Sequence, residues 1–138
     1  MSDFSLDHRL ERDTLFIARQ NGCQVRLMND ARYRWLVLIP EISKIRDWHD
    51  LPDKVERDIL SLTKNMSGLL KKFENADKIN VASLGNLVSQ FHLHLIVRYK
   101  NDAAWPGPVW GVGAAEPFTD EQAKAVIKMM QNLLALTS

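Results

Sequence analysis

Residues 90–98, with the sequence QFHLHLIVR, constrain the fold of this chain more than any other segment. Polar and apolar side chains alternate through its first half, which is typical of a β-strand with two different faces. Side chains two positions apart on a strand point the same way, so His92 and His94 are expected to share one face with Gln90. The segment therefore predicts a strand of an antiparallel sheet that carries two of the four histidines side by side.

Two adjacent imidazoles are suited to attack on a phosphate. One neutral imidazole can act as the nucleophile, and the other can donate a proton or a positive charge to a neighbouring oxygen. Alternatives remain open, because exposed polar side chains are ordinary on a half-solvated strand, and imidazoles two residues apart can chelate zinc or copper. A zinc site needs three or four protein ligands, however, and His8, Cys23 and His49 lack a recognisable ligand spacing, so no metal site is expected.

Hydrophobic periodicity and turn residues predict the other elements of the chain. The longest is a helix whose apolar residues recur at helical spacing, and Pro52 suits its first turn. The first helix is expected to stop near Asn21-Gly22, and the last two strands are expected to pair around Gly85-Asn86. The expected helices are residues 6–20, 52–75 and 119–136, and the expected strands are residues 24–28, 33–39, 78–84 and 88–98.

Composition favours one compact domain. A chain of 138 residues with 46% apolar and 25% charged residues can bury a core, so residues 1–138 are expected to form a single domain. The formal charge of +1 offers no strong field for nonspecific binding to nucleic acid or a membrane. The single cysteine, Cys23, excludes an internal disulfide and is expected to be a small buried residue. The N-terminus lacks the apolar core of a signal peptide and no run is long enough to span a membrane, which favours a cytoplasmic protein.

In the motif of the histidine triad (HIT) superfamily of nucleotide hydrolases and transferases, three histidines alternate with apolar residues. Residues 90–96 resemble this motif, with Gln90 in the position of the first histidine. The order of strands and helices over about residues 5–112 is also similar to the core of the superfamily. The resemblance implies an α+β, HIT-like fold with an antiparallel sheet of about five strands, one long central helix, and flanking N- and C-terminal helices. Gln90, the tryptophan-rich segment after the motif and the lack of a zinc-finger appendage are similar to a bacterial branch related to diadenosine polyphosphate hydrolases.

The resemblance also implies catalytic roles for three residues. His92 matches the middle histidine, which is the nucleophile of the family, and His94 matches the third and is the candidate donor to the phosphate oxygens. A backbone carbonyl within the triad strand is expected to hold the second ring nitrogen of His92. Gln90 can donate and accept hydrogen bonds but cannot carry charge or transfer a proton near neutral pH, which implies slower turnover or a different leaving group.

Four residues are expected to bind substrate, three of them on the same grounds. Asn29 matches a position that contacts the ribose hydroxyls, while Asn86 and Asn80 match polar residues that face phosphate. For Asn29 and Asn86 the alternative is a plain turn residue. Trp110 belongs to a stiff loop rich in proline and glycine, residues 105–111, which is expected to cover the site. The alternative is that its tryptophans fill the edge of the core or a subunit contact.

The implied activity is cleavage of a nucleotidyl conjugate, such as a dinucleoside polyphosphate, at its α-phosphate through a nucleotidyl-histidine intermediate on His92. This chemistry requires no cofactor, although a divalent cation can accompany the nucleotide. The expected partner is a nucleotide or dinucleotide, with no nucleic acid and no membrane, and the chain is expected to pair as a homodimer. The alternative is a catalytically weak or inactive nucleotide-binding protein with the same fold. Retention of both His92 and His94 favours the enzyme.

Overall fold

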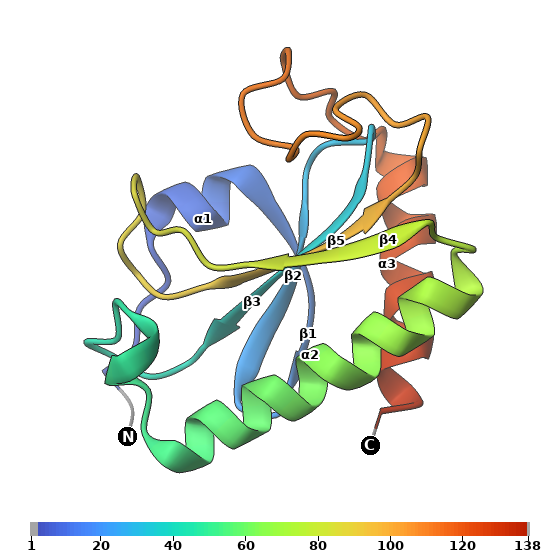
Figure 1. The fold of residues 1–138 in the computed structure, drawn as a ribbon. Helices are drawn as coiled ribbons and strands as arrows, with labels where there is room; N and C mark the ends of the chain where they lie inside the picture. Colours follow the sequence, from blue (N-terminus) through green and yellow to red (C-terminus); the bar gives the residue numbers. More distant parts are fainter. Residues whose placement is uncertain (1–2, 138) are drawn as a thin grey trace.

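A five-stranded antiparallel sheet forms the centre of the fold (Figure 1). The computed structural model describes residues 3–137. Its strands are β1 (Thr14–Gln20), β2 (Cys23–Met28), β3 (Arg34–Pro40), β4 (Lys78–Ala82) and β5 (Leu93–Arg98), in the order β1-β2-β3-β5-β4. The helices are α1 (His8–Asp13), α2 (Asp53–Phe73) and α3 (Asp120–Ala135), with a short 3-10 helix η1 (Trp48–Asp50) before α2. The expected α+β fold with about five strands and a long central helix is confirmed.

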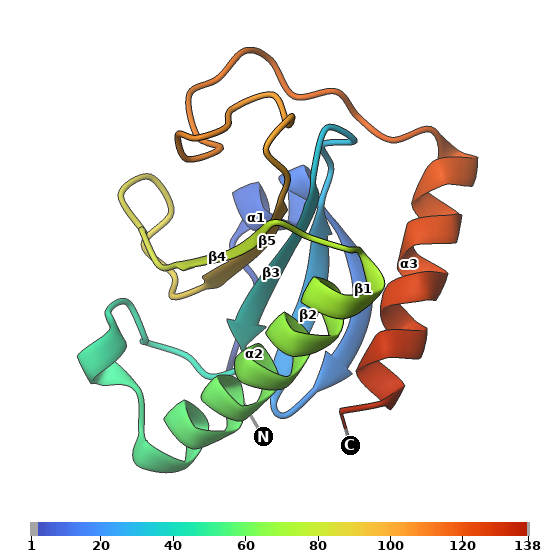
Figure 2. The same cartoon turned by 45° about the vertical axis from the view of Figure 1, so that its right-hand side comes forward.

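Different segments cover the two faces of the sheet. Helices α2 and α3 lie on one face of the sheet (Figure 2). Leu38 of β3 is buried there in the same core cluster as residues of both helices. On the other face, Trp35 and Val37 of β3 are buried with Leu10 of α1 and with residues of the segment after β5. β3 is therefore apolar on both sides, as expected for a strand from which helices and loops exclude water. His94 pairs with Val37 across the sheet, so it belongs to the face that α1 covers.

The expected helix of residues 6–20 is wrong over most of its length. Only α1 is helical, and Thr14 then adopts an extended backbone, with φ −130° and ψ 162°, at the start of β1. Pairing of β1 with β2 supplies backbone hydrogen bonds that replace those of a longer helix. Asn21 and Gly22 do not stop a helix but form the two-residue turn of the β1–β2 hairpin, with φ of 51° and 74°. An Asn-Gly turn of this kind matches the twist of paired strands.

The expected strand of residues 88–98 is shorter than predicted, because β5 begins only at Leu93. The residues between β4 and β5 form a loop, in which the Phe91 N–H donates to a carbonyl before α2 (3.0 Å) and not to a neighbouring strand. Gln90 and His92 therefore lie in the loop that leads into β5. Their positions follow from contacts of this loop, and the alternation of strand faces accounts only for His94 and the residues after it.

The sequence predicts both long helices to within two residues at each end. Helix α3 begins with a capping box, in which the Thr119 hydroxyl accepts from the Gln122 N–H and the Gln122 side chain accepts from the Thr119 N–H. Within residues 3–137 no helix is both long and apolar enough to cross a membrane.

Candidate active site

His92 and His94 lie side by side in the wall of a cavity of about 360 Å³. Their ring centroids are 4.9 Å apart, and the ring planes are inclined by 73°. Both side chains are buried, with exposed fractions of 6% and 4%, so the alternative of a half-solvated strand is wrong. Helix α1, Met28 of β2, the loop after β4 and Trp110 form the rest of the wall. The structure thus places two imidazoles, largely shielded from water, at a hollow open to a small molecule.

The backbone before β5 fixes the His92 ring. Its Nδ1 lies 2.7 Å from the Gln90 carbonyl oxygen, which can only accept, so Nδ1 carries the hydrogen and Nε2 keeps its lone pair. Burial lowers the pKa of His92, while the contact with the Gln90 carbonyl and the carboxylate of Asp7 act in the opposite direction. The ring is therefore neutral at neutral pH, with Nε2 available for attack on an electrophile.

His94 is held by aromatic side chains. The indole N–H of Trp35 donates to His94 Nδ1 over 2.9 Å, and the centroids of the two rings are 5.6 Å apart. The ring of Trp110 meets His94 edge-on at 4.9 Å between centroids. Burial and, to a smaller extent, the neighbouring His92 lower the pKa of His94 to about 3. His94 is therefore neutral throughout the physiological pH range.

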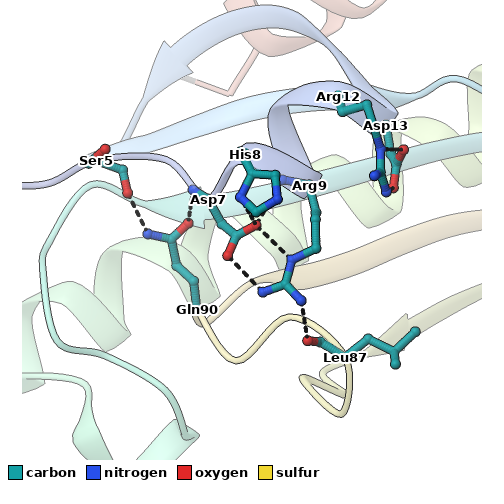
Figure 3. A network of polar contacts seen from close by, with 8 residues as sticks. All are labelled: Ser5, Asp7, His8, Arg9, Arg12, Asp13, Leu87 and Gln90. Atoms are coloured by element: carbon teal, nitrogen blue, oxygen red, sulfur yellow. Dashed lines mark hydrogen bonds and ion pairs between the residues drawn. The ribbon is translucent and has the colours of Figure 1, made fainter.

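The Gln90 side chain points to the N-terminal segment (Figure 3). Its Nε2 donates to the Ser5 carbonyl and its Oε1 accepts from the Asp7 N–H, both over 2.9 Å. The carboxylate of Asp7 pairs with Arg9 at 3.0 Å, and Arg9 in turn donates to the Leu87 carbonyl at 2.9 Å. The Gln90 amide, in the position of the first triad histidine, thus joins the loop before β5 to the N-terminal segment. Arg9 joins the same segment to Leu87 on the other side of the cavity.

The four expected substrate-binding residues lie in different places. Asn86 and Trp110 line the same cavity as the histidines. Asn29 lines an adjoining cavity of about 450 Å³, which shares Trp110 with the first, and its Oδ1 accepts from the Phe118 N–H (3.0 Å). Asn80 lines neither cavity. Its Oδ1 accepts from the guanidinium of a buried arginine in β5 (2.8 Å).

That arginine, Arg98, shapes the segment after β5. It is 2% exposed and pairs with Asp102 at 2.8 Å, and it also donates to the Gly107 carbonyl at 2.8 Å. Burial acts to raise the pKa of Asp102, but hydrogen bonds from Arg98 and from backbone N–H groups outweigh it and lower the pKa to about 2. The pair folds the tryptophan-rich loop back on the sheet and so supports Trp110 where it meets His94.

Sequence reasoning missed Trp35, Asp7 and Arg9. Trp35 reads as one more apolar residue of a buried strand, and its proximity to His94 follows only from the β3–β5 register, which pairs Trp35 with Ile96. Arg9 reads as a polar position on a long first helix. Ser5 or Asp7 is expected to start that helix, and Asp7 is indeed the N-cap of the short α1, but its charge contact with the triad could not be predicted from this role.

Metal-ligating side chains gather elsewhere in the described part of the chain. The one group found in residues 3–137 is the exposed cluster of Asp47, His49 and Asp50 around η1. The carboxylate of Asp50 accepts from the backbone N–H of Asp47, as a capping residue does. Cys23 is fully buried, as expected, and burial raises the pKa of its thiol to about 12.

Comparison with known proteins agrees with this geometry. A sequence profile of the HIT domain matches residues 9–101. A histidine triad protein from Marinobacter aquaeolei is 41% identical, with a TM-score of 0.94 over 98% of each chain. Histidine triad proteins from Sinorhizobium meliloti (39% identity, TM-score 0.88, 99% of this chain and 98% of that one) and Bradyrhizobium japonicum (34%, 0.91, 95% and 98%) are also similar. No curated protein sequence matches the chain.

This chain therefore belongs to the histidine triad (HIT) family. HIT proteins are commonly nucleotide hydrolases or transferases, so membership supports a function connected with nucleotides.

Proposed function

We propose that this protein cleaves a nucleotidyl conjugate, such as a dinucleoside polyphosphate, at its α-phosphate, with His92 carrying the nucleotidyl group between two steps. The observation that supports this most strongly is the 2.7 Å contact between His92 Nδ1 and the Gln90 carbonyl. It leaves Nε2 of a neutral ring with its lone pair, beside a cavity within the size range of small-molecule sites.

In the first step the Nε2 lone pair of His92 forms a bond to the α-phosphorus. The bond from phosphorus to the leaving group breaks, and its electron pair departs with the leaving oxygen. In the second step the oxygen of water bonds to the same phosphorus and releases a proton to the solvent, the bond to Nε2 breaks with its electron pair returning to Nε2, and nucleoside monophosphate is released. Two easier displacements replace one difficult one. His94 donates to the nonbridging oxygens, where negative charge accumulates.

The two adjoining cavities divide the substrate between them in this proposal. Asn86 is placed to donate to phosphate oxygens beside the histidines, and Trp110, shared by both cavities, offers a ring face or edge to the base. Asn29 keeps its amide N–H groups free for the ribose hydroxyls, because its Oδ1 already accepts from Phe118. Asn80 contributes to the support of Arg98.

In this proposal the role of Gln90 is to hold the segments beside the histidines in place. Its amide cannot transfer a proton near neutral pH, but its two backbone contacts fix the segment that carries Asp7. The Gln90 carbonyl that holds His92 belongs to the same residue, so the side chain also restrains the loop on which the nucleophile depends.

The experiment is incubation of the purified protein with a panel of adenine and guanine nucleotidyl conjugates, dinucleoside polyphosphates included. We expect release of nucleoside monophosphate and a nucleotidyl adduct that mass spectrometry locates on His92. His92→Ala should abolish both, while His49→Ala, which removes an exposed histidine outside the cavity, should abolish neither.

Absence of turnover and of adduct, with tight nucleotide binding by both the wild type and His92→Ala, would overturn the enzyme proposal. The protein would then be a nucleotide-binding member of the family.

A further inference from the structure

The contact between Trp35 and His94 restricts the chemistry of the third triad position. We infer that Trp35 fixes His94 as the neutral tautomer with its hydrogen on Nε2, so that this site acts on nucleotidyl anhydrides and not on nucleotidyl esters or amidates. The inference rests on the proposed function and specifies its substrate class. Trp35 acts as a positioning residue for His94, to which its indole N–H donates, and its ring also lines the adjoining cavity that holds Asn29.

The tautomer follows from the donor and acceptor inventory of the two rings. An indole N–H can only donate, so His94 Nδ1, 2.9 Å away, must present a lone pair. A neutral imidazole carries one hydrogen, which must then be on Nε2. A second proton on Nδ1 would face the indole N–H and leave two donors unsatisfied between side chains that are 6% and 4% exposed. Burial of an unsatisfied donor is costly, so the cationic form is excluded while Trp35 stays in place.

The surroundings of Trp35 hold it in place. Its ring meets Tyr33 edge-on at 6.2 Å between centroids and Trp110 edge-on at 5.6 Å. These contacts bring together β3, the turn before it and the loop after β5. Rotation of the indole away from His94 would disturb packing on the whole face of the sheet that α1 covers.

Charged groups near the cavity do not favour a proton on His94. The charged side chains in its wall are Arg9 and Asp13, both from α1. Arg9 is paired with Asp7, whose charge raises the pKa of His92. The neighbouring titratable group that acts on His94 is His92, whose protonated form disfavours a second positive charge beside it. From β3 and from the loop after β5, the rings in contact with His94 are those of Trp35 and Trp110.

A neutral His94 can donate a hydrogen bond but cannot deliver its proton to a departing group near neutral pH. Gln90 cannot do so either, and the Nδ1 hydrogen of His92 is taken by the backbone carbonyl. When the bond from phosphorus to the leaving group breaks, the electron pair must therefore remain on the leaving oxygen as a stable anion. Polyphosphate and carboxylate meet this requirement, whereas alkoxide and amide anions need a proton as they leave.

Tautomer and substrate class are measured separately. Nitrogen-15 NMR of the wild type should show His94 with its hydrogen on Nε2 and no protonation down to pH values at which the protein remains folded. Adenylyl conjugates of four kinds should then be compared: a dinucleoside tetraphosphate, an acetyl anhydride, a methyl ester and an N-alkyl phosphoramidate. We expect both anhydrides to be cleaved at least about 100-fold faster than the ester and the amidate, the lower end of what a general acid supplies.

A matched pair of tryptophan variants isolates the contact. Trp35→Phe removes the indole N–H but leaves His94 buried, so protonation of His94 in the NMR titration should occur at a higher pH than in the wild type, and at pH values where His94 is protonated the preference for anhydrides should shrink at least about tenfold. Trp48→Phe loses an indole hydrogen bond to Glu56 outside the cavity and should change neither result. If Trp35→Phe does not fold, the wild-type spectrum and substrate comparison still decide the inference.

Comparable rates on anhydrides and on the ester or amidate, or a wild-type His94 with its hydrogen on Nδ1, would overturn the inference. An adduct on His92 with every conjugate would leave the proposed function intact while refuting the restriction to anhydrides. Absence of an adduct with all four conjugates would refute the proposed function instead.

Discussion

Replacing Gln90 with histidine completes the three-histidine motif but removes a structural contact, so we expect Gln90→His to weaken the site. The amide holds the N-terminal segment through two opposite interactions, donation to the Ser5 carbonyl and acceptance from the Asp7 N–H. A carboxamide presents its donor and acceptor side by side on one carbon. The two nitrogens of an imidazole diverge, so a histidine cannot make both contacts in the same geometry.

The size of the effect follows from these two hydrogen bonds. Each contributes about 0.5 to 1.5 kcal/mol, and since the one to Ser5 is exposed, the sum is about 1–2 kcal/mol. The loss should appear as local opening of the segment before and within α1, because a helix of six residues has little stability of its own. A change of this size increases the open population about 5- to 30-fold.

Amide hydrogen exchange at Asp7 and Arg9 measures the opening directly, and kcat/KM on a dinucleoside polyphosphate measures its effect on the site. We expect faster exchange and a lower kcat/KM in Gln90→His. Ser89→Ala, at the exposed neighbouring position, should change neither. Unchanged exchange together with a higher kcat/KM in Gln90→His would refute the assigned role of the amide and would mean that the first position is catalytic.

Three further predictions concern the same site. Lowering the pH from about 6.5 to about 5.5 should reduce the free energy of unfolding by about 1 kcal/mol more in the wild type than in His94→Gln, as measured by urea denaturation. Burial lowers the pKa of His94 from 6.5 to about 3, so in this pH range the unfolded chain binds a proton that the folded chain does not. An equal decrease in the free energy of unfolding of both proteins would contradict this. Asn86→Ala should lower kcat/KM about 10- to 100-fold through loss of a hydrogen bond to a charged phosphate. Asn101→Ala, at an exposed position, is the control, and an equal kcat/KM in the two variants would argue against the contact. Arg98→Met leaves the Asp102 carboxylate buried without its cation and should lower the free energy of unfolding by about 3 kcal/mol or more. The double variant Arg98→Met/Asp102→Asn should recover part of this loss. Full stability of the single variant would show that the pair is dispensable.

Local sequence patterns predict the parts of the fold that depend on local interactions. The two long helices follow from apolar periodicity and from caps within their own segments. The first 20 residues show the limit of this reasoning, because the apolar spacing that suits a helix is also present in β1. Pairing with β2 decides between the two, and the Asn21-Gly22 dipeptide was the available signal for a hairpin. Tertiary pairing overrides local propensity here.

The candidate site shows the same division between local and distant contacts. The two-residue spacing correctly brings His92 and His94 together, although His92 lies before the strand. Gln90 contacts Asp7 across 83 positions of sequence, and Trp35 reaches His94 across 59, so no local pattern contains either contact. The homodimer and the cytoplasmic location stay predictions.

The distant contacts around the triad share one consequence. Gln90 has no titratable group, Trp35 holds His94 as a neutral donor, and burial lowers the pKa of His92, so no triad position carries a positive charge at neutral pH. The Nδ1 hydrogen of His92 is committed to the Gln90 carbonyl, and its Nε2 must be free to attack. In the proposed mechanism the triad therefore supplies a nucleophile and a hydrogen-bond donor, while the proton balance depends on the leaving group and the attacking water. Replacement of the first histidine is then compatible with turnover, because the restriction to anhydrides removes the need for an acid at the leaving group.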